Sequence, residues 1–203
     1  MLMGIVLARD GRHELFAMFE RRTMTKRETG FTLIELLIVV AIIGIIAAIA
    51  IPSLLRARVS ANESATIGDI RTVISAQAAY QSSNAGFYDG KLTCLVKPSG
   101  GCIPSYPTNA PTFIDSQMAA ATAKSGYNRS WLAGAVPAPL PLTASPTSTS
   151  AYVYGAIPSS IGQTGVRGFM GDSSGLLCYT PSGVMPGTVA GPGIDITTCT
   201  PLQ

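Results

Sequence analysis

Residues 31–51 read FTLIELLIVVAIIGIIAAIAI and contain a single charged side chain, Glu35. As an α-helix, these 21 residues would be about 31 Å long, which matches the hydrocarbon thickness of a bilayer. The segment is therefore predicted to be a membrane-spanning helix. Positive charge before such a helix favours the cytoplasmic side, so we expect the remainder of the chain to be exported. The basic residues before it are Arg21, Arg22, Lys26 and Arg27.

Glu35 distinguishes this segment from a simple membrane anchor. A carboxylate in a membrane helix costs up to about 2.5–3.5 kcal/mol at mid-bilayer and less near the interface, so it is a candidate functional residue. A cleaved secretory signal would have a shorter apolar core, of roughly 7–15 residues, followed by a small-residue cleavage site. The core here is longer, and residues 52–55 (PSLL) follow it without such a site. On these grounds alone, Glu35 has either a role in assembly or the position of a tolerated interfacial charge.

Residues 26–40, KRETGFTLIELLIVV, resemble the class III signal of type IV pilins and type II secretion pseudopilins. The resemblance extends to Leu55 and includes Pro52 at the distance usual in that family. It implies that a prepilin peptidase cleaves between Gly30 and Phe31 on the cytoplasmic face. It also implies that the new amino group of Phe31 is N-methylated.

The same resemblance gives Glu35 a role in filament assembly, together with Pro52. In such filaments the helices form an apolar core, where an unpaired ammonium or carboxylate is costly. Glu35 is expected to neutralise the Phe31 amine of a neighbouring subunit and so to fix the register. The expected parts of the chain are a removed leader (1–30), an apolar helix (31–52), an amphipathic helix (53–80) and a globular head (81–203).

The leader is long for this family. Translation from Met24 would give MTKRETG, a leader of typical length, and residues 1–23, including His13, would then be a mis-assigned start. A long leader is the alternative. Neither choice alters residues 31–203.

Residues 53–80 are predicted to form an amphipathic helix. Pro52 should kink or locally melt the helix without ending it, because proline lacks a backbone donor and clashes with the preceding turn. Apolar residues then recur mostly at three- and four-residue steps, which is typical of a helix with one buried face. These residues are Leu55, Val59, Ile67, Ile70, Ile74 and Ala78.

The remaining chain predicts a small antiparallel sheet. Residues 81–112 contain repeated turn signals and are expected to form an irregular loop. Asp115 is a predicted N-cap for a short helix that Gly126 ends, and the Pro-rich residues 137–150 are expected to be an exposed, mobile loop. The fold class is α+β, resembling type IV pilins, with the long helix packed on about four strands. The predicted strands are 127–133, 151–157, 166–170 and 176–179, with a hairpin turn at 171–175.

The four cysteines all follow the apolar segment. An even number of cysteines in an exported domain favours disulfides, and the C-x-x-C pairs typical of metal sites are absent from the sequence. Three pairings are possible. We favour Cys94–Cys102 and Cys178–Cys199, because each pair closes one loop rich in Gly and Pro. The second loop is similar to the disulfide-closed C-terminal loop of many pilins.

The sequence gives almost no support for an enzyme. Residues 31–203 contain no histidine, and their seven acidic residues are scattered without a paired spacing. No cofactor or metal is expected: Asp172, beside Ser173 and Ser174, is more typical of turn chemistry than of a calcium site. Eight basic and seven acidic residues leave residues 31–203 at a net charge of +1, which argues against nucleic acid as a partner.

The predicted function is a structural subunit of a type IV pilus that polymerises through its N-terminal helix. Its expected partners are copies of itself, the prepilin peptidase, an inner-membrane assembly platform and the lipid bilayer. It is expected in the bacterial inner membrane, with a cytoplasmic N-terminus, and then in a surface filament. One alternative is a pseudopilin in a periplasmic type II secretion filament, and another is a monomeric membrane-anchored module for adhesion or DNA uptake.

Overall fold

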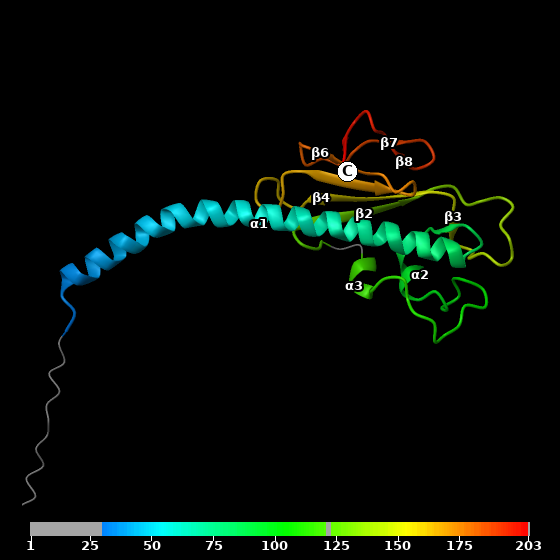
Figure 1. Ribbon diagram of the computed structural model, residues 1–203, viewed down its shortest axis with the longest axis horizontal. Helices are drawn as coiled ribbons and strands as arrows, with labels where there is room; N and C mark the ends of the chain where they lie inside the picture. Colours follow the sequence, from blue (N-terminus) through cyan, green and yellow to red (C-terminus); the bar gives the residue numbers. More distant parts are fainter. Residues whose placement is uncertain (1–29, 121–122, 203) are drawn as a thin grey trace, which may run out of the picture. The chain divides into compact units, whose positions relative to one another are not determined.

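The computed structural model describes residues 30–120 and 123–202 (Figure 1). The predicted leader up to Thr29, including His13 and the alternative start at Met24, lies outside the described residues. The chain divides into two compact units, with the boundary between Gly44 and Ile45.

Helix α1 runs from Leu33 to Ser83 without interruption and contains Pro52. The prediction that Pro52 does not end the helix is therefore confirmed, and the helix extends three residues beyond the predicted end at Tyr80. Proline lacks a backbone N–H, so the carbonyl of Ala48, one turn earlier, receives no helical hydrogen bond from it.

The buried face of α1 differs from the predicted apolar stripe. Ile70 belongs to both, but Ala78 is exposed and Ile67 is only half-buried. Three residues of the observed face are polar: Thr66 donates to the carbonyl of Asn62 in the same helix, and the head supplies partners for the other two, which a search for apolar periodicity alone could not anticipate. The buried residues recur at three- and four-residue steps, apart from one adjacent pair: Glu63, Thr66, Ile70, Val73, Ala76, Gln77 and Tyr80.

The head contains a five-stranded antiparallel sheet, against the four strands predicted. Strand β9 was missed because it has only two residues, one of them Pro201. Strand β5 begins two residues later than predicted, because the N–H groups of Val166 and Arg167 donate to Glu63. In spatial order, the strands are β2 (Tyr127–Ala133), β4 (Tyr152–Pro158), β5 (Gly168–Asp172), β6 (Leu177–Thr180) and β9 (Thr200–Pro201).

Short elements complete the head. Asp115 caps α3 as predicted, since its side chain accepts a 2.8 Å hydrogen bond from the N–H of Met118. The helix ends at Ala119, however, whereas Gly126 adopts a φ of +74° in the tight turn before β2. The other short elements are β1 (Tyr88–Asp89) paired with β3 (Ser148–Thr149), β7 (Thr188–Val189) paired with β8 (Gly193–Ile194), α2 (Leu92–Val96) and α3 (Ser116–Ala119).

The expectation that residues 137–150 form a wholly exposed loop was wrong for their second half. Asn84, just beyond α1, accepts a hydrogen bond from the N–H of Ser145 at 2.6 Å and donates one to Oγ of Ser148 at 2.8 Å. These bonds satisfy polar groups that would otherwise keep the segment in water. Its buried residues are Ala144, Ser145, Ser148 and Thr149.

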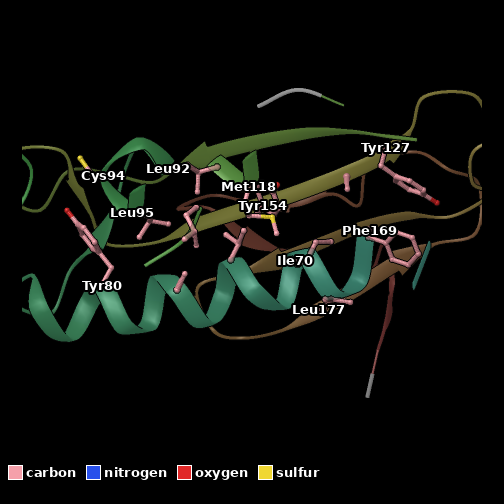
Figure 2. Packing of buried hydrophobic residues seen from close by; sticks show 14 of the residues in the cluster. Ile70, Tyr80, Leu92, Cys94, Leu95, Met118, Tyr127, Tyr154, Phe169 and Leu177 are labelled. Carbon is pink, nitrogen blue, oxygen red and sulfur yellow. The ribbon is translucent and has the colours of Figure 1, made fainter. Parts of the chain in front are cut away.

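The main core lies between α1 and one face of the sheet (Figure 2). Tyr154 and Phe169 point from β4 and β5 into this core, which Ile70 enters from the helix. Gly171 allows the helix to approach closely, because a Cβ atom there would lie 2.5 Å from Cγ2 of Ile70. Figure 1 likewise shows the second half of α1 running along the sheet.

The opposite face of the sheet is covered by the C-terminal segment. Val153 and Met170 pack there with Ile194, and the Cys178–Cys199 disulfide closes the same layer. Six of the seven residues of β4 are consequently buried, as in a strand covered on both faces. Both favoured cysteine pairings are confirmed, since Cys94 is bonded to Cys102.

A buried ion cluster fixes α1 to β2. Asp69 on the helix accepts a 2.9 Å hydrogen bond from Nζ of Lys124 and pairs through its other oxygen with Arg129. The Arg129 side chain is almost fully buried and also donates to the hydroxyl of Tyr154 at 3.2 Å. Removing Asp69 would leave the buried Arg129 guanidinium without its counter-charge, and breaking a buried pair in this way typically costs about 3–5 kcal/mol.

Asp89 is a fully buried carboxylate beside the C-terminal end of α1. Its Oδ1 accepts from the N–H of Lys91 at 2.9 Å and from Oγ1 of Thr147 at 3.1 Å, while Oδ2 has no partner among the described residues. Burial raises the pKa of Asp89 from 3.8 to about 6, although these hydrogen bonds and the charge of Lys91 oppose the shift. Ionised Asp89 therefore destabilises the head at neutral pH.

Asp89→Asn should remove a pH-dependent loss of stability. A raised folded-state pKa means that the wild type loses stability as the pH rises from about 4 to about 6, by up to about 3 kcal/mol, whereas Asn does not ionise. Urea unfolding of the full chain in detergent between pH 4 and 7 measures this effect. As the pH increases across that window, the unfolding free energy of the variant should rise relative to that of the wild type. A difference independent of pH would contradict the assignment.

Candidate assembly surface

The first part of α1 presents apolar side chains on all sides. The exposed fractions of its large apolar residues up to Ile51 run from 50% for Val39 to 79% for Leu33, and Phe31, just before the helix, is 86% exposed. This helix is also long and apolar enough to cross a membrane. Such a surface is unstable in water and requires lipid or other protein chains to cover it.

Thr32 and Glu35 form a capping box at the start of α1. Oε2 of Glu35 accepts a 2.8 Å hydrogen bond from the N–H of Thr32 and a 2.6 Å bond from its hydroxyl. The N–H of Glu35 donates in return to Oγ1 of Thr32 at 3.3 Å. This reciprocal arrangement satisfies N–H groups that have no partner within the helix, and it places a negative charge where the helix dipole favours one.

The cap orients the Glu35 carboxylate without neutralising it. All hydrogen bonds that it accepts from the described residues use Oε2, which leaves Oε1 for a partner from outside. Thr32 contributes dipoles and carries no charge. The negative charge of Glu35 therefore has no counter-charge among the residues that the structure describes.

Three of the four predicted N-terminal site residues, Gly30, Phe31 and Glu35, lie together at the start of α1. Gly30 and Phe31 lie exposed immediately before α1, next to the cap that contains Glu35. Pro52 lies 17 residues beyond Glu35, about five helical turns along α1. Thr32 was missed in the sequence, although the pattern Thr-x-x-Glu before an apolar run is a known signal for a capping box.

A second feature, also missed, is a carboxylate clamp between α1 and the loop that precedes β5. Oε1 of Glu63 accepts from the N–H groups of Val166 at 2.9 Å and Arg167 at 3.1 Å. Its Oε2 accepts from Nε and Nη2 of Arg167 at 2.8 and 2.6 Å. Burial acts to raise the pKa of Glu63, but these hydrogen bonds and the positive charge of Arg167 outweigh it and lower the pKa below 4.5. No sequence signal links residues more than 100 positions apart.

An apolar groove of about 620 Å³ lies beside this clamp. One wall comes from α1, between Pro52 and Glu63, and the other from Gly162, Val166 and Arg167 of the loop. The groove belongs to the unit that begins at Ile45. We refer to it below as the base groove.

A family model described as the prokaryotic N-terminal methylation motif matches residues 25–51. The chain carries this methylation motif. The match begins before the predicted cleavage position at Gly30 and ends at the last residue of the exposed apolar segment.

Proteins similar to this chain are type IV pilins and type II secretion core proteins. The type IV wide pilus major component PilA4 of Thermus thermophilus is 48% identical over 32% of this chain and 50% of its own length. The type IV major pilin protein PilA of Myxococcus xanthus is 43% identical over 31% of this chain and 29% of its own length. The type II secretion system core protein G of Pseudomonas aeruginosa is 32% identical over 39% of this chain and 58% of its own length.

These alignments span half or less of the two pilins and under two thirds of the secretion protein. No solved structure gives a significant match to the chain. The long helix packed on antiparallel strands is consistent with the pilin-like α+β fold expected from the sequence.

Glu63→Ala should loosen the loop before β5. It removes the acceptor for two backbone N–H groups and leaves Arg167 without its counter-charge, which we expect to cost about 2–3 kcal/mol. Hydrogen exchange of the full chain in detergent should show amide exchange at Val166 and Arg167 at least tenfold faster. Glu63→Gln, which keeps an acceptor, should show a smaller increase. Unchanged exchange in the alanine variant would show that other contacts hold the loop.

Proposed function

We propose that this chain is a structural subunit of a type IV pilus, which polymerises through the apolar part of α1 after its leader is removed. The observation that carries the proposal is the methylation motif at residues 25–51, placed directly on an exposed apolar helix. A prepilin peptidase would cleave between Gly30 and Phe31, and the amino group of Phe31 would be methylated. Before assembly the chain would lie in the inner membrane with its N-terminus in the cytoplasm.

Two steps would follow cleavage. An assembly platform in the inner membrane would move the subunit from lipid into the filament, exchanging one apolar environment for another. Identical subunits joined head to tail make contacts that do not close into a ring, which generates a helical filament. The apolar helices would form its interior and the heads its surface.

Glu35 would neutralise the Phe31 amine of a neighbouring subunit. The capping box holds its carboxylate through Oε2, so Oε1 can accept a hydrogen bond from that ammonium group. Charge-assisted hydrogen bonds of this kind are about twice as strong as neutral ones, and an apolar interior penalises any subunit in the wrong register. Pro52 would belong to the same assembly segment.

We assign the chain a structural and not a catalytic role. The pilins that it resembles are filament components by name. Residues 31–203 contain no histidine, the commonest general acid or base in enzymes.

The second candidate is a pseudopilin of a type II secretion system. It is favoured by the alignment with core protein G, which extends over 82 residues, compared with 66 for the Thermus pilin. The mechanism of processing and assembly would be the same, and the location would differ. Recovery of the protein in filaments sheared from the cell surface supports a pilus, whereas a filament confined to the periplasm supports the pseudopilin.

The processed protein should begin at N-methylated Phe31. N-terminal sequencing and intact mass of the sheared surface fraction should give the mass of residues 31–203 with one added methyl group and two disulfides. An uncut chain that remains in the membrane would mean an ordinary anchored domain.

Glu35→Ala should abolish filament assembly without preventing cleavage or membrane insertion. We expect at least a tenfold loss of sheared filaments, because the Phe31 amine would be left unpaired in an apolar interior. Glu35→Gln is the matched control, since its side-chain carbonyl can still accept the cap hydrogen bonds from Thr32 but carries no charge. Loss of filaments in both variants supports the charge pairing. Normal assembly of the glutamine variant would mean that the cap matters and the charge does not.

A further inference from the structure

The base groove is a preformed depression in the head. Glu63 makes four hydrogen bonds to Val166 and Arg167, two through main-chain N–H groups and two through the guanidinium. These bonds hold the loop wall at a fixed position beside α1. A partner would therefore meet a groove that already exists and would not have to order the loop, which lowers the entropic cost of binding.

The walls of the groove suit an apolar partner. Pro52 and Leu55 are exposed on α1, and Val166 is 44% exposed on the opposite wall. Glu63 and Arg167 neutralise each other at 2.6 Å, which leaves the exposed Arg56 as the one charge of the lining that is not paired among the described residues. The long stem of an arginine can pack on apolar surface while its charged end stays in water. Burial of these side chains by a partner would be favourable, at roughly 25 cal/mol for each Å² of apolar surface.

The occupant that best fits this groove is the apolar helix of another copy. Along the face of α1 that lines the groove, the exposed apolar side chains of Ile49 and Ile45 follow towards the N-terminus, so the groove continues into the apolar surface that the proposed filament would bury. The segment 31–51 of the same chain continues covalently into the helical wall of the groove, so it cannot also fill the groove. Ala41, Gly44 and Ala48 lie three and four residues apart and would allow two helices to approach closely.

We propose that the base groove receives the apolar segment, residues 31–51, of a second copy of this chain in the filament. This inference rests on the proposed pilus function and adds a contact between the helix of one subunit and the head of another. The loop before β5 is then part of the subunit interface. Glu63 acts as a positioning residue that keeps this wall in place.

The test uses full-length chains in cells, with two matched variants. Val166→Gln places a longer polar side chain in the groove and keeps the backbone N–H that donates to Glu63. Val189→Gln makes the same change on β7, at a valine that is 49% exposed and does not line the groove. We expect at least a tenfold loss of sheared filaments for Val166→Gln and wild-type yield for Val189→Gln, with both disulfides intact in each variant.

A photo-crosslinking residue, benzoylphenylalanine, at position 166 provides a second readout, which does not require a wild-type yield of filaments. Irradiated filaments should contain covalent dimers whose cross-linked peptide maps to residues 31–51 by mass spectrometry. Normal filaments from Val166→Gln, or cross-links at position 166 to lipid or to other residues only, would overturn the groove contact and leave the pilus function standing. Failure of the cleaved wild type to form any filament would instead overturn the pilus function itself.

Discussion

One continuous helix must satisfy two different environments, and the rest of the structure depends on this constraint. Up to Ile51, α1 is apolar on all sides and exposed, so only lipid or other chains can cover it. From Glu63 to Tyr80 the same helix buries a single face, which the sheet covers. The sheet in turn needs a cover on its other face, and the C-terminal segment provides it, closed by the Cys178–Cys199 disulfide.

The polar residues of the buried helical face determine where the loops of the head must lie. Glu63 binds the loop before β5, and Gln77 exchanges hydrogen bonds with the main chain of Asp89 at 2.9 and 3.1 Å. Asn84, just beyond the end of α1, holds the segment around Ser145 in the same way. Unpaired, each group would cost about 1–3 kcal/mol, so these contacts specify the arrangement of the loops as well as stabilising it.

The predictable part of this molecule is the part governed by local pattern. The apolar run, the passage of the helix through Pro52, the Asp115 cap, strand β2 and both disulfides follow from spacing, hydrophobic period and loop length. The two-residue strands and the burial of Ser145 and Ser148 depend on partners distant in sequence, which single residues do not indicate. The clamp of Glu63 onto Arg167 was missed for the same reason, whereas the Thr32 cap has a local signal that was overlooked.

The acidic residues of α1 differ in where they find a counter-charge. Glu63 is paired with Arg167, and Asp69 with Arg129 and Lys124, so both acids on the buried half of α1 are neutralised within their own chain. Glu35 has only the neutral Thr32 as its partner among the described residues. A subunit can therefore fold with both of these helical acids compensated while the charge at the start of its helix remains unpaired among the described residues. In the proposed filament, insertion into an apolar interior would make that charge costly until a neighbour supplied a cation, so correct assembly would depend on another copy and not on the fold of the head.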